Sequence, residues 1–268
     1  MTALLLNTDI RLSEGLSTYE ISLERDPEIT FEASGCSTVF VVLSGTGCLR
    51  LRTFARKGAQ VRYLFWNRTA GHSAVDETHE VMSEADVTVA YGDCSGHSLE
   101  RNAYMALRGR GARGRLTAAN LVNNKINEHL EVVNFAPETF GNIENYAVVL
   151  KKGVLTIDAV GKIVKGAKGS ESHQTSRALS MEEGQKSKIL PELLIDENDV
   201  QASHAMSMGR VDEDQLYYMM SRGLSVADCT ALIASGYLLP ICSVLGDEDL
   251  SKQLTEEMEE RIAVLCSM

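Results

Sequence analysis

Apolar and polar residues alternate with a period of two through most of the first two hundred positions. Short runs with alternating or continuous apolar character recur there, such as "VFVVLSGTGCLRLRTF", "AQVRYLFWNRT", "DVTVAYGD", "AYMALRG", "RLTAANLV" and "VLTIDAVGKIV". This period is typical of β-strands, whose side chains point to opposite faces in turn. No amphipathic helical stretch of ten or more residues separates one run from the next, which argues against an alternating βαβ fold.

The residues between these runs favour a β-solenoid over a β-sandwich. Glycines mark the expected turns, at Gly58, Gly111, Gly153, Gly166 and Gly184. The hairpin dipeptides Asn-Gly and Asp-Gly, which a sandwich would be expected to use, occur nowhere in the chain. A coil of parallel strands with Gly and small polar residues at its corners accounts for this pattern, although no strict repeat length is visible.

After position 209 the period changes from two to that of a helix. Asp212 is expected to cap a helix with Gln215 as its capping-box partner, and Gly223 stands where a left-handed residue would end it. The residues Leu216, Met219 and Met220 fall at helical spacing between them.

Two further helices are expected beyond this one. Ser225 and Asp228 repeat the capping signal, and an apolar stripe follows, up to Pro240, at Val226, Cys229, Leu232 and Ile233. A third helix is expected from about Asp247, with apolar residues four apart at Leu250, Leu254, Met258 and Ile262. The pattern therefore predicts a mainly β protein with an N-terminal segment 1–27, a β-solenoid core 28–208 whose strands start by about residue 28, and a C-terminal α-helical domain 209–268.

Composition and charge narrow the class of protein. The 268 residues are 44% hydrophobic and 24% charged, which is enough to bury a sizeable core. The 26 basic and 37 acidic residues give a net charge of -11, and no segment clusters Lys and Arg with aromatic residues, so we expect no nucleic-acid partner. The beginning of the chain has no basic segment, and no 18 apolar residues follow one another. We therefore expect a cytoplasmic protein that does not bind membranes.

The six cysteines carry no metal-binding signature. Cys36, Cys48, Cys94, Cys229, Cys242 and Cys266 are spread along the chain without a C-x-x-C pair. They are expected to be isolated buried thiols, and no self-contained metal cage is indicated.

One glycine motif resembles a dinucleotide-binding fingerprint but lacks its context. "GRGARG", from Gly109 to Gly114, matches G-x-G-x-x-G, and Glu131 follows at about the right distance for a ribose-binding carboxylate. A dinucleotide site needs a helix directly after the glycines, whereas "RLTAANLVNN" reads as a strand. We therefore interpret the motif as a corner between coils. No P-loop sequence is present either, so we do not expect the chain to hydrolyse ATP.

Three stretches in the second half resemble a known family. "SHQTSR", "LPELLIDENDVQASH" and "DEDQLYYMMSRGLS" occur in the order and at the spacing found in the SufB/SufD family of iron–sulfur cluster assembly proteins. The resemblance covers about residues 100 to 240 well and the earlier strands loosely. It implies a right-handed parallel β-helix with a C-terminal helical domain. The extra N-terminal helical region usual in the family is expected to have no counterpart here.

The resemblance also implies partners and a site. In this family, B-type and D-type subunits pair through their β-helices, and each binds a copy of the SufC ATPase by its C-terminal helices. A nascent, transient iron–sulfur cluster is held at the interface by a B-type cysteine and a D-type histidine, which corresponds to His204 here. Imidazole and thiolate are both plausible iron ligands. A capping or surface histidine at the end of the strands is the structural alternative for His204.

Two departures make the sequence resemble the D-type subunits more than the B-type. The position of the B-type cluster cysteine is occupied by Ser176, and Ala205 stands where the B-type glutamate follows the histidine. The protein is therefore expected to contribute His204 and to borrow a thiolate from a partner. His173 and Gln174, in the "SHQTSR" turn, are expected either to support the ligand or, more simply, to bond the backbone of neighbouring coils.

The remaining candidate residues fall into two groups. A surface for the ATPase is expected at Leu216, Tyr217, Tyr218, Met219 and Arg222, since the run has too many aromatic and Met residues for one buried stripe. The other histidines lie in polar surroundings and are expected to be solvated, namely His72, His79, His97 and His129.

Three functions follow as alternatives. The first is a non-catalytic, SufD-like scaffold that works with a SufB-type subunit and a SufC-type ATPase. The second is a self-pairing homodimer that assembles clusters without a B-type partner. The third is a β-helical carbohydrate-active enzyme, which would need a carboxylate cluster, with calcium or a basic residue, on one face of the solenoid.

Overall fold

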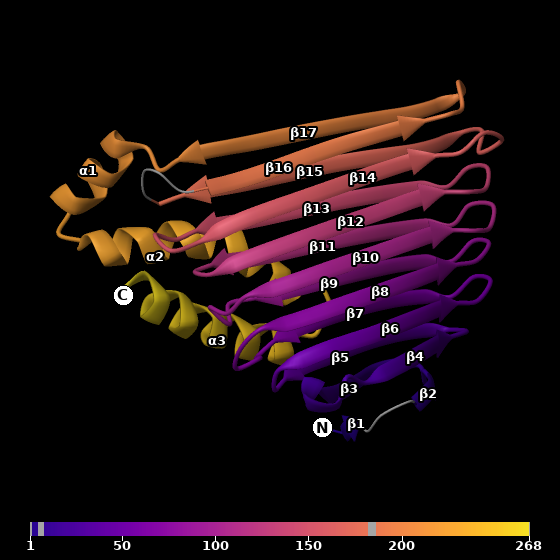
Figure 1. Ribbon diagram of the computed structural model, residues 1–268, viewed down its shortest axis with the longest axis horizontal. Helices are drawn as coiled ribbons and strands as arrows, with labels where there is room; N and C mark the ends of the chain where they lie inside the picture. Colours follow the sequence, from indigo (N-terminus) through magenta and orange to yellow (C-terminus); the bar gives the residue numbers. More distant parts are fainter. Residues whose placement is uncertain (1, 5–7, 182–185, 268) are drawn as a thin grey trace.

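The chain winds into a parallel β-solenoid whose strands belong alternately to two sheets (Figure 1). A computed structural model describes residues 2–4, 8–181 and 186–267. Sheet A contains the odd-numbered strands and sheet B the even-numbered ones, and each sheet follows the order of the strands along the chain. All pairings between neighbouring strands are parallel. The solenoid expected from the period-two pattern and the missing hairpin turns is confirmed.

The strands of the two sheets have the following bounds. Sheet A consists of β1 (Thr2–Leu4), β3 (Gly15–Ser22), β5 (Cys36–Ser44), β7 (Gln60–Asn67), β9 (Asp86–Asp93), β11 (Arg113–Val122), β13 (Phe140–Val149), β15 (Ser170–Ser180) and β17 (Val200–Arg210). Sheet B consists of β2 (Thr8–Arg11), β4 (Glu28–Ala33), β6 (Gly47–Ala55), β8 (Ser73–Val81), β10 (Leu99–Leu107), β12 (Lys125–Asn134), β14 (Val154–Ile163) and β16 (Lys186–Ile195). A short 3-10 helix, η1 (Leu23–Arg25), separates β3 from β4.

The solenoid starts earlier along the chain than its pattern suggested. Strands β2 and β3 already pair with β4 and β5, so strands are present well before residue 28, within the segment 1–27 that the pattern set apart. These first strands are short or only half-buried, and their alternation is correspondingly weak. The division of the chain into three domains stays a prediction.

The coils differ in length, which is why no strict repeat is visible in the sequence. Cys36 and its partner Gln60 are 24 residues apart, whereas His173 and its partner Ser203 are 30 apart. The strands stay in register and the turns absorb the difference. Gly58, Gly111 and Gly166 adopt positive φ angles in these turns, as expected of corner glycines. Gly184 lies outside the described residues.

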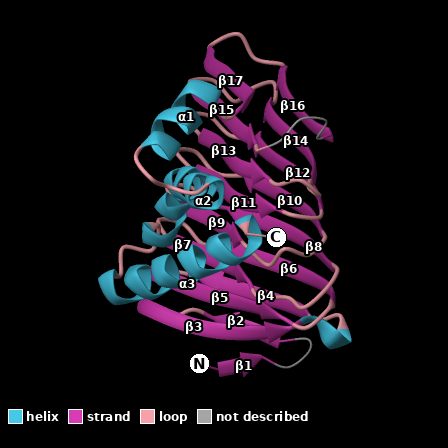
Figure 2. Cartoon of the chain, turned by 90° about the vertical axis from the view of Figure 1, so that its left-hand side faces the viewer, coloured by secondary structure: helices cyan, strands magenta, loops and turns pink. Residues whose placement is uncertain are grey.

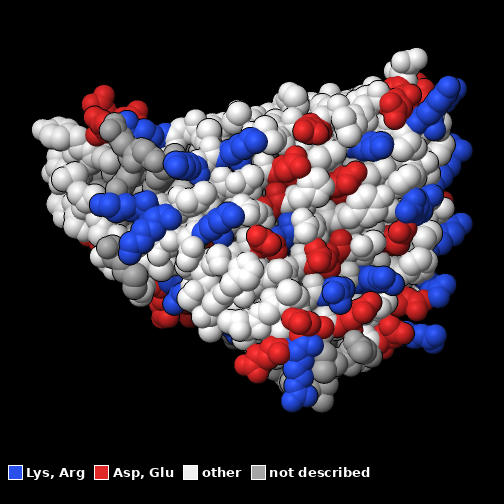
Figure 3. All heavy atoms as spheres, in the orientation of Figure 1, with Lys and Arg blue, Asp and Glu red and all other residues white. Residues whose placement is uncertain are grey.

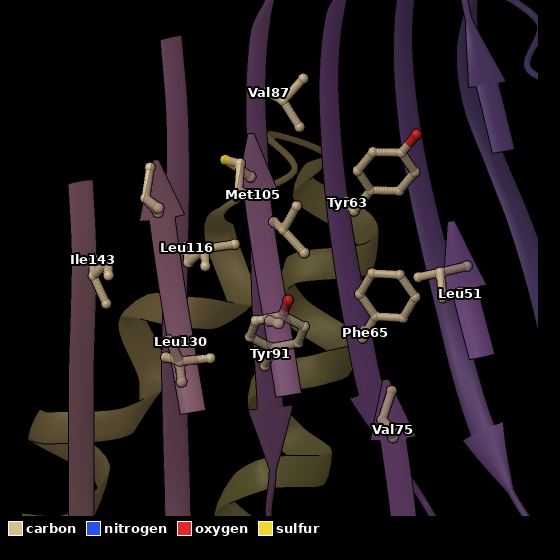
Figure 4. Packing of buried hydrophobic residues seen from close by; sticks show 14 of the residues in the cluster. Leu51, Tyr63, Phe65, Val75, Val87, Tyr91, Met105, Leu116, Leu130 and Ile143 are labelled. Atoms are coloured by element: carbon tan, nitrogen blue, oxygen red, sulfur yellow. The ribbon is translucent and has the colours of Figure 1, made fainter. Parts of the chain in front are cut away.

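Apolar side chains from both sheets fill the interior of the solenoid (Figure 4). The coils near the N-terminus contain a row of aromatic rings that includes Tyr63, Phe65 and Tyr91, with neighbouring centroids about 6 Å apart. Smaller side chains such as Ala118 and polar ones such as Asn145 take the corresponding interior positions further along. The interior therefore becomes more polar towards β17.

In the described part of the chain, three α-helices follow the last strand, and two of them cover the outer face of sheet A (Figure 2). They are α1 (Glu213–Ser221), α2 (Val226–Leu238) and α3 (Glu248–Cys266), with a 3-10 helix η2 (Leu239–Ser243) after α2. Strands such as β7 and β9 alternate in their first half and are buried on both faces in their second half. This arrangement explains the continuous apolar ends of those runs, because the helices cover only that part of the sheet.

The expected helix starts are confirmed, but within the described residues the Gln215 side chain makes no reciprocal hydrogen bond to Asp212, so the capping box expected at α1 is not formed. Asp212 caps α1 by accepting hydrogen bonds from the backbone of Asp214 and Gln215, and Ser225 and Asp228 form a reciprocal capping box for α2. Asp247 caps α3, and Gly223 has a φ of 95°. The apolar stripe expected on α2 is only partly right. Cys229 is buried, but Val226 and Leu232 are 56% and 60% exposed, because α2 contacts the sheet over one narrow face.

Polar contacts attach α3 to the first half of the solenoid. Glu257 accepts hydrogen bonds from Trp66 Nε1 at 3.1 Å and from Arg68 Nε at 2.7 Å. Arg261 donates to the carbonyl oxygens of Cys94 and Ser95. The last helix therefore crosses back over coils that lie far from it in the sequence.

Ion pairs between successive turns line one edge of the solenoid, where Lys and Arg are visible in Figure 3. Examples are Lys57 with Glu84 and Arg110 with Glu138. Arg110 lies in the "GRGARG" segment, which forms the turn between β10 and β11 and leads into a strand. A Cβ at Gly109 would lie 2.0 Å from the backbone nitrogen of Ser83, so glycine is required there by the close packing of turns. The interpretation of this motif as a corner is confirmed.

Candidate functional site at the open end of the solenoid

The last coil, formed by β16 and β17, is open on its outer side. Both strands stand at the ends of their sheets, and no strand within the described residues pairs with their free edges. All of β17 after Val200 is exposed, including Met206 and Met208 at 48% each. Unpaired edges of this kind and apolar side chains at a mouth are typical of surfaces that another chain covers.

His204 lies on the row of residues that faces the interior of the solenoid. The register aligns it with Gln174 on β15, and the same row continues through Ile143 and Leu116, which are buried in the core. His204 is nevertheless exposed, because no further coil covers it. The strand therefore presents this imidazole at the mouth of the solenoid.

Gln174 closes the interior directly behind His204. Its side chain is 2% exposed, and its amide Nε2 donates to the carbonyl oxygen of Glu192 on β16 at 2.8 Å. Its Oε1 is buried and has no hydrogen-bond partner within the described part of the protein. Gln174 thus links the two sheets at the last covered coil and keeps one acceptor free.

His173 faces the other side of the same sheet. Its Nδ1 lies 2.7 Å from Ser203 Oγ and its Nε2 lies 3.3 Å from Glu171 Oε2, and its ring packs against Phe140 on the outer surface. The "SHQTSR" stretch belongs to strand β15, so the expectation that it forms a turn is wrong. Because consecutive strand residues point to opposite faces, only Gln174 shares the face of His204.

Ser176 occupies the next interior position along β15, opposite Met206. It is 1% exposed, and Asn145 Nδ2 lies 3.2 Å from its hydroxyl. The sequence has no cysteine between Cys94 and Cys229, so β15, β16 and β17 carry no thiol. Of the described residues, no group of three or more His, Cys, Asp or Glu is arranged to hold a metal ion.

The cysteines are carried by other elements than the strands of this mouth. Cys94, Cys229 and Cys242 are buried, and burial raises the pKa of Cys242 to about 11 and that of Cys94 well above its ordinary value. Cys36 and Cys48 are exposed near the other end of the solenoid, so the expectation of uniformly buried thiols is wrong for these two. Each stands at the start of a strand, where the outer face is open to solvent.

A buried polar network inside the solenoid escaped the sequence reasoning. Arg101 bonds Glu128 and lies with its guanidinium 3.9 Å from the centre of the Tyr91 ring. Tyr91 donates to Glu77 at 2.7 Å, and Glu77 also bonds His79 at 3.1 Å. The expectation that His79 is solvated is wrong, since it is fully buried. The signal was present, because Glu77 and His79 alternate with outward-facing residues on β8.

Exposed aromatic and apolar residues gather on α1 and the start of α2. Tyr217 and Tyr218 are 75% and 59% exposed, and Met220 is 45% exposed, whereas Leu216 and Met219 are partly buried. Arg222 Nη2 lies 3.2 Å from Tyr218 Oη, with its guanidinium over that ring. Helix α1 has no fully buried residue. A helix this exposed and this apolar is unusual for a free surface.

One segment has the length and apolarity that a membrane span would need. It runs from Val226 to Ser243 with a mean hydropathy of 1.4, and 28% of it is buried in the protein. Core helices of soluble proteins meet the same criterion, and Ala234 and Leu238 pack here against the outer face of sheet A. The segment is therefore weak evidence for a membrane.

The fold and the open mouth define a class of protein, a parallel β-solenoid with an uncapped last coil and an appended helical unit. Residues 25–237 match a family model described as SUF system FeS cluster assembly, SufBD core domain. The chain belongs to this family. The match extends the resemblance noted in the second half of the sequence over nearly the whole solenoid.

Curated relatives carry the same family name. The chain is 36% identical over 132 residues to the iron–sulfur cluster assembly protein SufD of Bacillus subtilis, which covers 49% of this chain and 30% of that protein. It is 23% identical over 260 residues to SufB of the same organism, which covers 93% of this chain and 56% of that protein. A SufBD family protein of Mycobacterium bovis is 27% identical over 208 residues, 75% of this chain and 25% of that protein. The chain thus spans about half or less of the length of these relatives.

Proposed function

We propose that this protein is a SufD-like scaffold subunit of a SUF iron–sulfur cluster assembly complex. Family membership supports the general role, and the 36% identity to a SufD over part of the chain supports the D-like type. The observation that carries the proposal is the position of His204, exposed at the mouth of the solenoid on the interior row. A ligand in this position faces whatever chain closes the last coil.

A second subunit would complete the site. The free edges of β16 and β17, with exposed Met206 and Met208, offer backbone groups and apolar area to a partner solenoid. The nascent cluster is the cargo, and it needs thiolates that these strands do not carry. A SufB-type subunit that contributes a cysteine would supply one, while His204 supplies the imidazole. We assign the cluster to the interface as a transient, shared species.

The helical region would connect this interface to an ATPase. Tyr217, Tyr218 and Arg222, together with the partly buried Leu216 and Met219, form the surface that we assign to a SufC-type partner. Only two residues, Val211 and Asp212, separate the end of β17 from the start of α1. Movement of α1 by a bound ATPase would therefore act on the strand that holds His204. ATP hydrolysis belongs to that partner in this scheme, and the scaffold itself is non-catalytic and cytoplasmic.

A self-pairing homodimer is the second arrangement. The same open end would serve two identical subunits, but their mouths would then bring together two imidazoles and no thiolate. Family membership also counts against a carbohydrate-active solenoid, since the matched model describes cluster assembly.

Co-purification distinguishes the two arrangements. The tagged protein would be co-expressed with a SufB-type subunit and a SufC-type ATPase, and the captured complex analysed by native mass spectrometry. We expect a complex that contains all three kinds of subunit, with the His204-bearing subunit present once for each SufB-type subunit. A stable homodimer that excludes the SufB-type subunit would refute the heteromeric proposal.

A further inference from the structure

A cavity of about 530 Å³ lies between the outer face of sheet A and the α2–η2 segment, away from the mouth that holds His204. Its helical wall is apolar and includes Tyr237, Ile241 and Val244. Its sheet wall is polar and basic, with arginines from three strands. Ligand sites commonly combine an apolar wall with a few convergent polar groups in a cavity of this size.

The basic wall is organised by the strand register. Arg62, Thr88 and Arg115 are direct neighbours on β7, β9 and β11. Strands in a sheet are about 4.8 Å apart, so the two arginines start about 10 Å from each other with the threonine between them. The same three residues also line an adjoining cavity of about 720 Å³. They therefore form a ridge that both cavities share.

Carboxylates balance the positive charges on this wall only in part. Arg115 is paired with Asp86 at 2.8 Å, but Arg62 and Arg177 make no ion pair within the residues that the structure describes. Glu144 is the one acidic residue among the described residues that line the first cavity. An excess of positive charge in a partly enclosed cavity is unusual in a protein with a net charge of -11.

Arg62, one of these arginines, lies close to the turn between η2 and α3. A Cβ built on Gly246, in the turn between η2 and α3, would lie 3.3 Å from Arg62 Nη1. The guanidinium therefore lies against this turn, away from the floor of the sheet. Arg62 therefore lies beside this turn, and within the described residues it has no carboxylate partner.

We propose that this cavity binds a small organic anion with a ring or hydrocarbon body. A phosphate or carboxylate would lie on the ridge and accept hydrogen bonds from Arg62, Thr88 and Arg115, with Arg177 adding charge from the far side. The apolar body would pack against Ile241 and Val244. This inference does not rest on the proposed role in cluster assembly, and its test reads out binding alone.

The test uses the full-length protein labelled at isoleucine and valine methyl groups. Phenyl phosphate, benzoate and neutral benzyl alcohol would be titrated, and the methyl signals of Ile241 and Val244 followed by NMR. We expect phenyl phosphate or benzoate to shift these signals, and benzyl alcohol to shift them far less. The stronger of the two anions identifies the head group as phosphate or carboxylate.

Variants then test the arginines. Arg62→Gln is expected to weaken anion binding about tenfold or more, because it removes a charged donor from the ridge. Arg177→Gln, made separately, is expected to weaken it less, because it removes only a positive charge from the far side of the cavity. Arg25→Gln, with the same loss of charge at an exposed position outside both cavities, is the matched control and is expected to bind normally. Unchanged melting temperatures would show that the variants fold.

Several outcomes would overturn the proposal. Equal shifts with benzyl alcohol would show an apolar crevice with no anion site. If the anion shifted the signals of Arg62→Gln as strongly as those of the control, the ridge would have no role in binding. If millimolar anion caused no shifts at Ile241 and Val244, the cavity would not bind this class of ligand.

Discussion

Arg101 donates a hydrogen bond to Glu128 inside the solenoid, where both side chains are buried. Glu128 also accepts from Asn120 at 2.8 Å, and Arg101 Nε lies 3.9 Å from Glu77. The arginine thus stands between two buried carboxylates from neighbouring coils. These three charged side chains stand where apolar residues would otherwise pack, and they connect strands β8, β10 and β12 of sheet B.

Arg101→Met is expected to destabilise the protein by about 3–5 kcal/mol, because it leaves buried carboxylates without their cation. Urea unfolding followed by circular dichroism would measure the change. Arg110→Met is the matched control, since the Arg110–Glu138 pair is 70% and 56% exposed, and its loss should cost less than about 1 kcal/mol. If both variants lost a similar free energy of unfolding, the buried Arg101–Glu128 pair would contribute no more to stability than the exposed pair.

The reactivity of the cysteines tests the packing of the helices on sheet A. At pH 8 the exposed Cys36 and Cys48 should react rapidly with a thiol reagent. Burial raises the pKa of Cys242 and of Cys266 to about 11, so only about one part in a thousand of each is thiolate at that pH. Cys94 and Cys229 are covered as well. Mass spectrometry of the first reaction phase should find label at Cys36 and Cys48 only, and label at Cys94 would contradict the packing.

The attachment of α3 gives a prediction about pH. Burial tends to raise the pKa of Glu257, but hydrogen bonds from Arg68 and Trp66 outweigh it, and the net pKa lies below its ordinary value of 4.5. A lowered pKa contributes stability above the ordinary value, and this stability is lost as the pH falls through the lowered one.

Glu257→Gln should therefore cost about 1 kcal/mol at pH 7, a modest value because Arg68 is 39% exposed. The difference from the unmodified protein should shrink as the pH falls below 4.5. Paired urea titrations between pH 7 and pH 3 would measure it. If the difference did not change with pH, the packing of the Glu257 side chain, and not its charge, would stabilise the attachment of α3.

The fold could be predicted from the sequence because its rules are local. Alternation predicted the strands, the capping residues Asp212 and Ser225 predicted the starts of the first two helices, and apolar residues four apart predicted the third. The packing of the helices on the outer face of sheet A could not be predicted from such local patterns. Residues such as Leu64 and Ala90 extend an apolar run, and only the docked helices show that these positions face away from the solenoid interior.

The candidate site was less predictable, because it depends on register across coils. His204 and Gln174 are 30 residues apart, and coil lengths vary, so the sequence alone does not align them. The opposite orientation of His173 follows once β15 is known to be a strand. The buried position of His79 depends likewise on which face of β8 is interior.

The exposed face of α1 should be required for binding the ATPase. Tyr217→Ala combined with Arg222→Glu removes the most exposed aromatic ring and reverses the charge that lies over Tyr218. Affinity for a SufC-type partner should fall at least tenfold, as for truncation of a central interface residue. Isothermal titration calorimetry would measure it. Tyr104→Ala, on the outer side of sheet B, is the control, and equal losses in both would show a general effect on folding.

His204 gives the sharpest test of the proposed site. Replacing this exposed side chain with Ala removes no core volume, so the free energy of unfolding should change by less than about 1 kcal/mol. Cluster assembly by the complete complex should nevertheless fall sharply, which anaerobic reconstitution with measured iron and sulfide would show. His173→Ala is the matched control, because the same imidazole is removed from the outer face of the neighbouring strand. If His173→Ala lost as much assembly, or if His204→Ala lowered the melting temperature while assembly per folded molecule was retained, His204 would be a structural residue and the mouth of the solenoid would not hold the cluster.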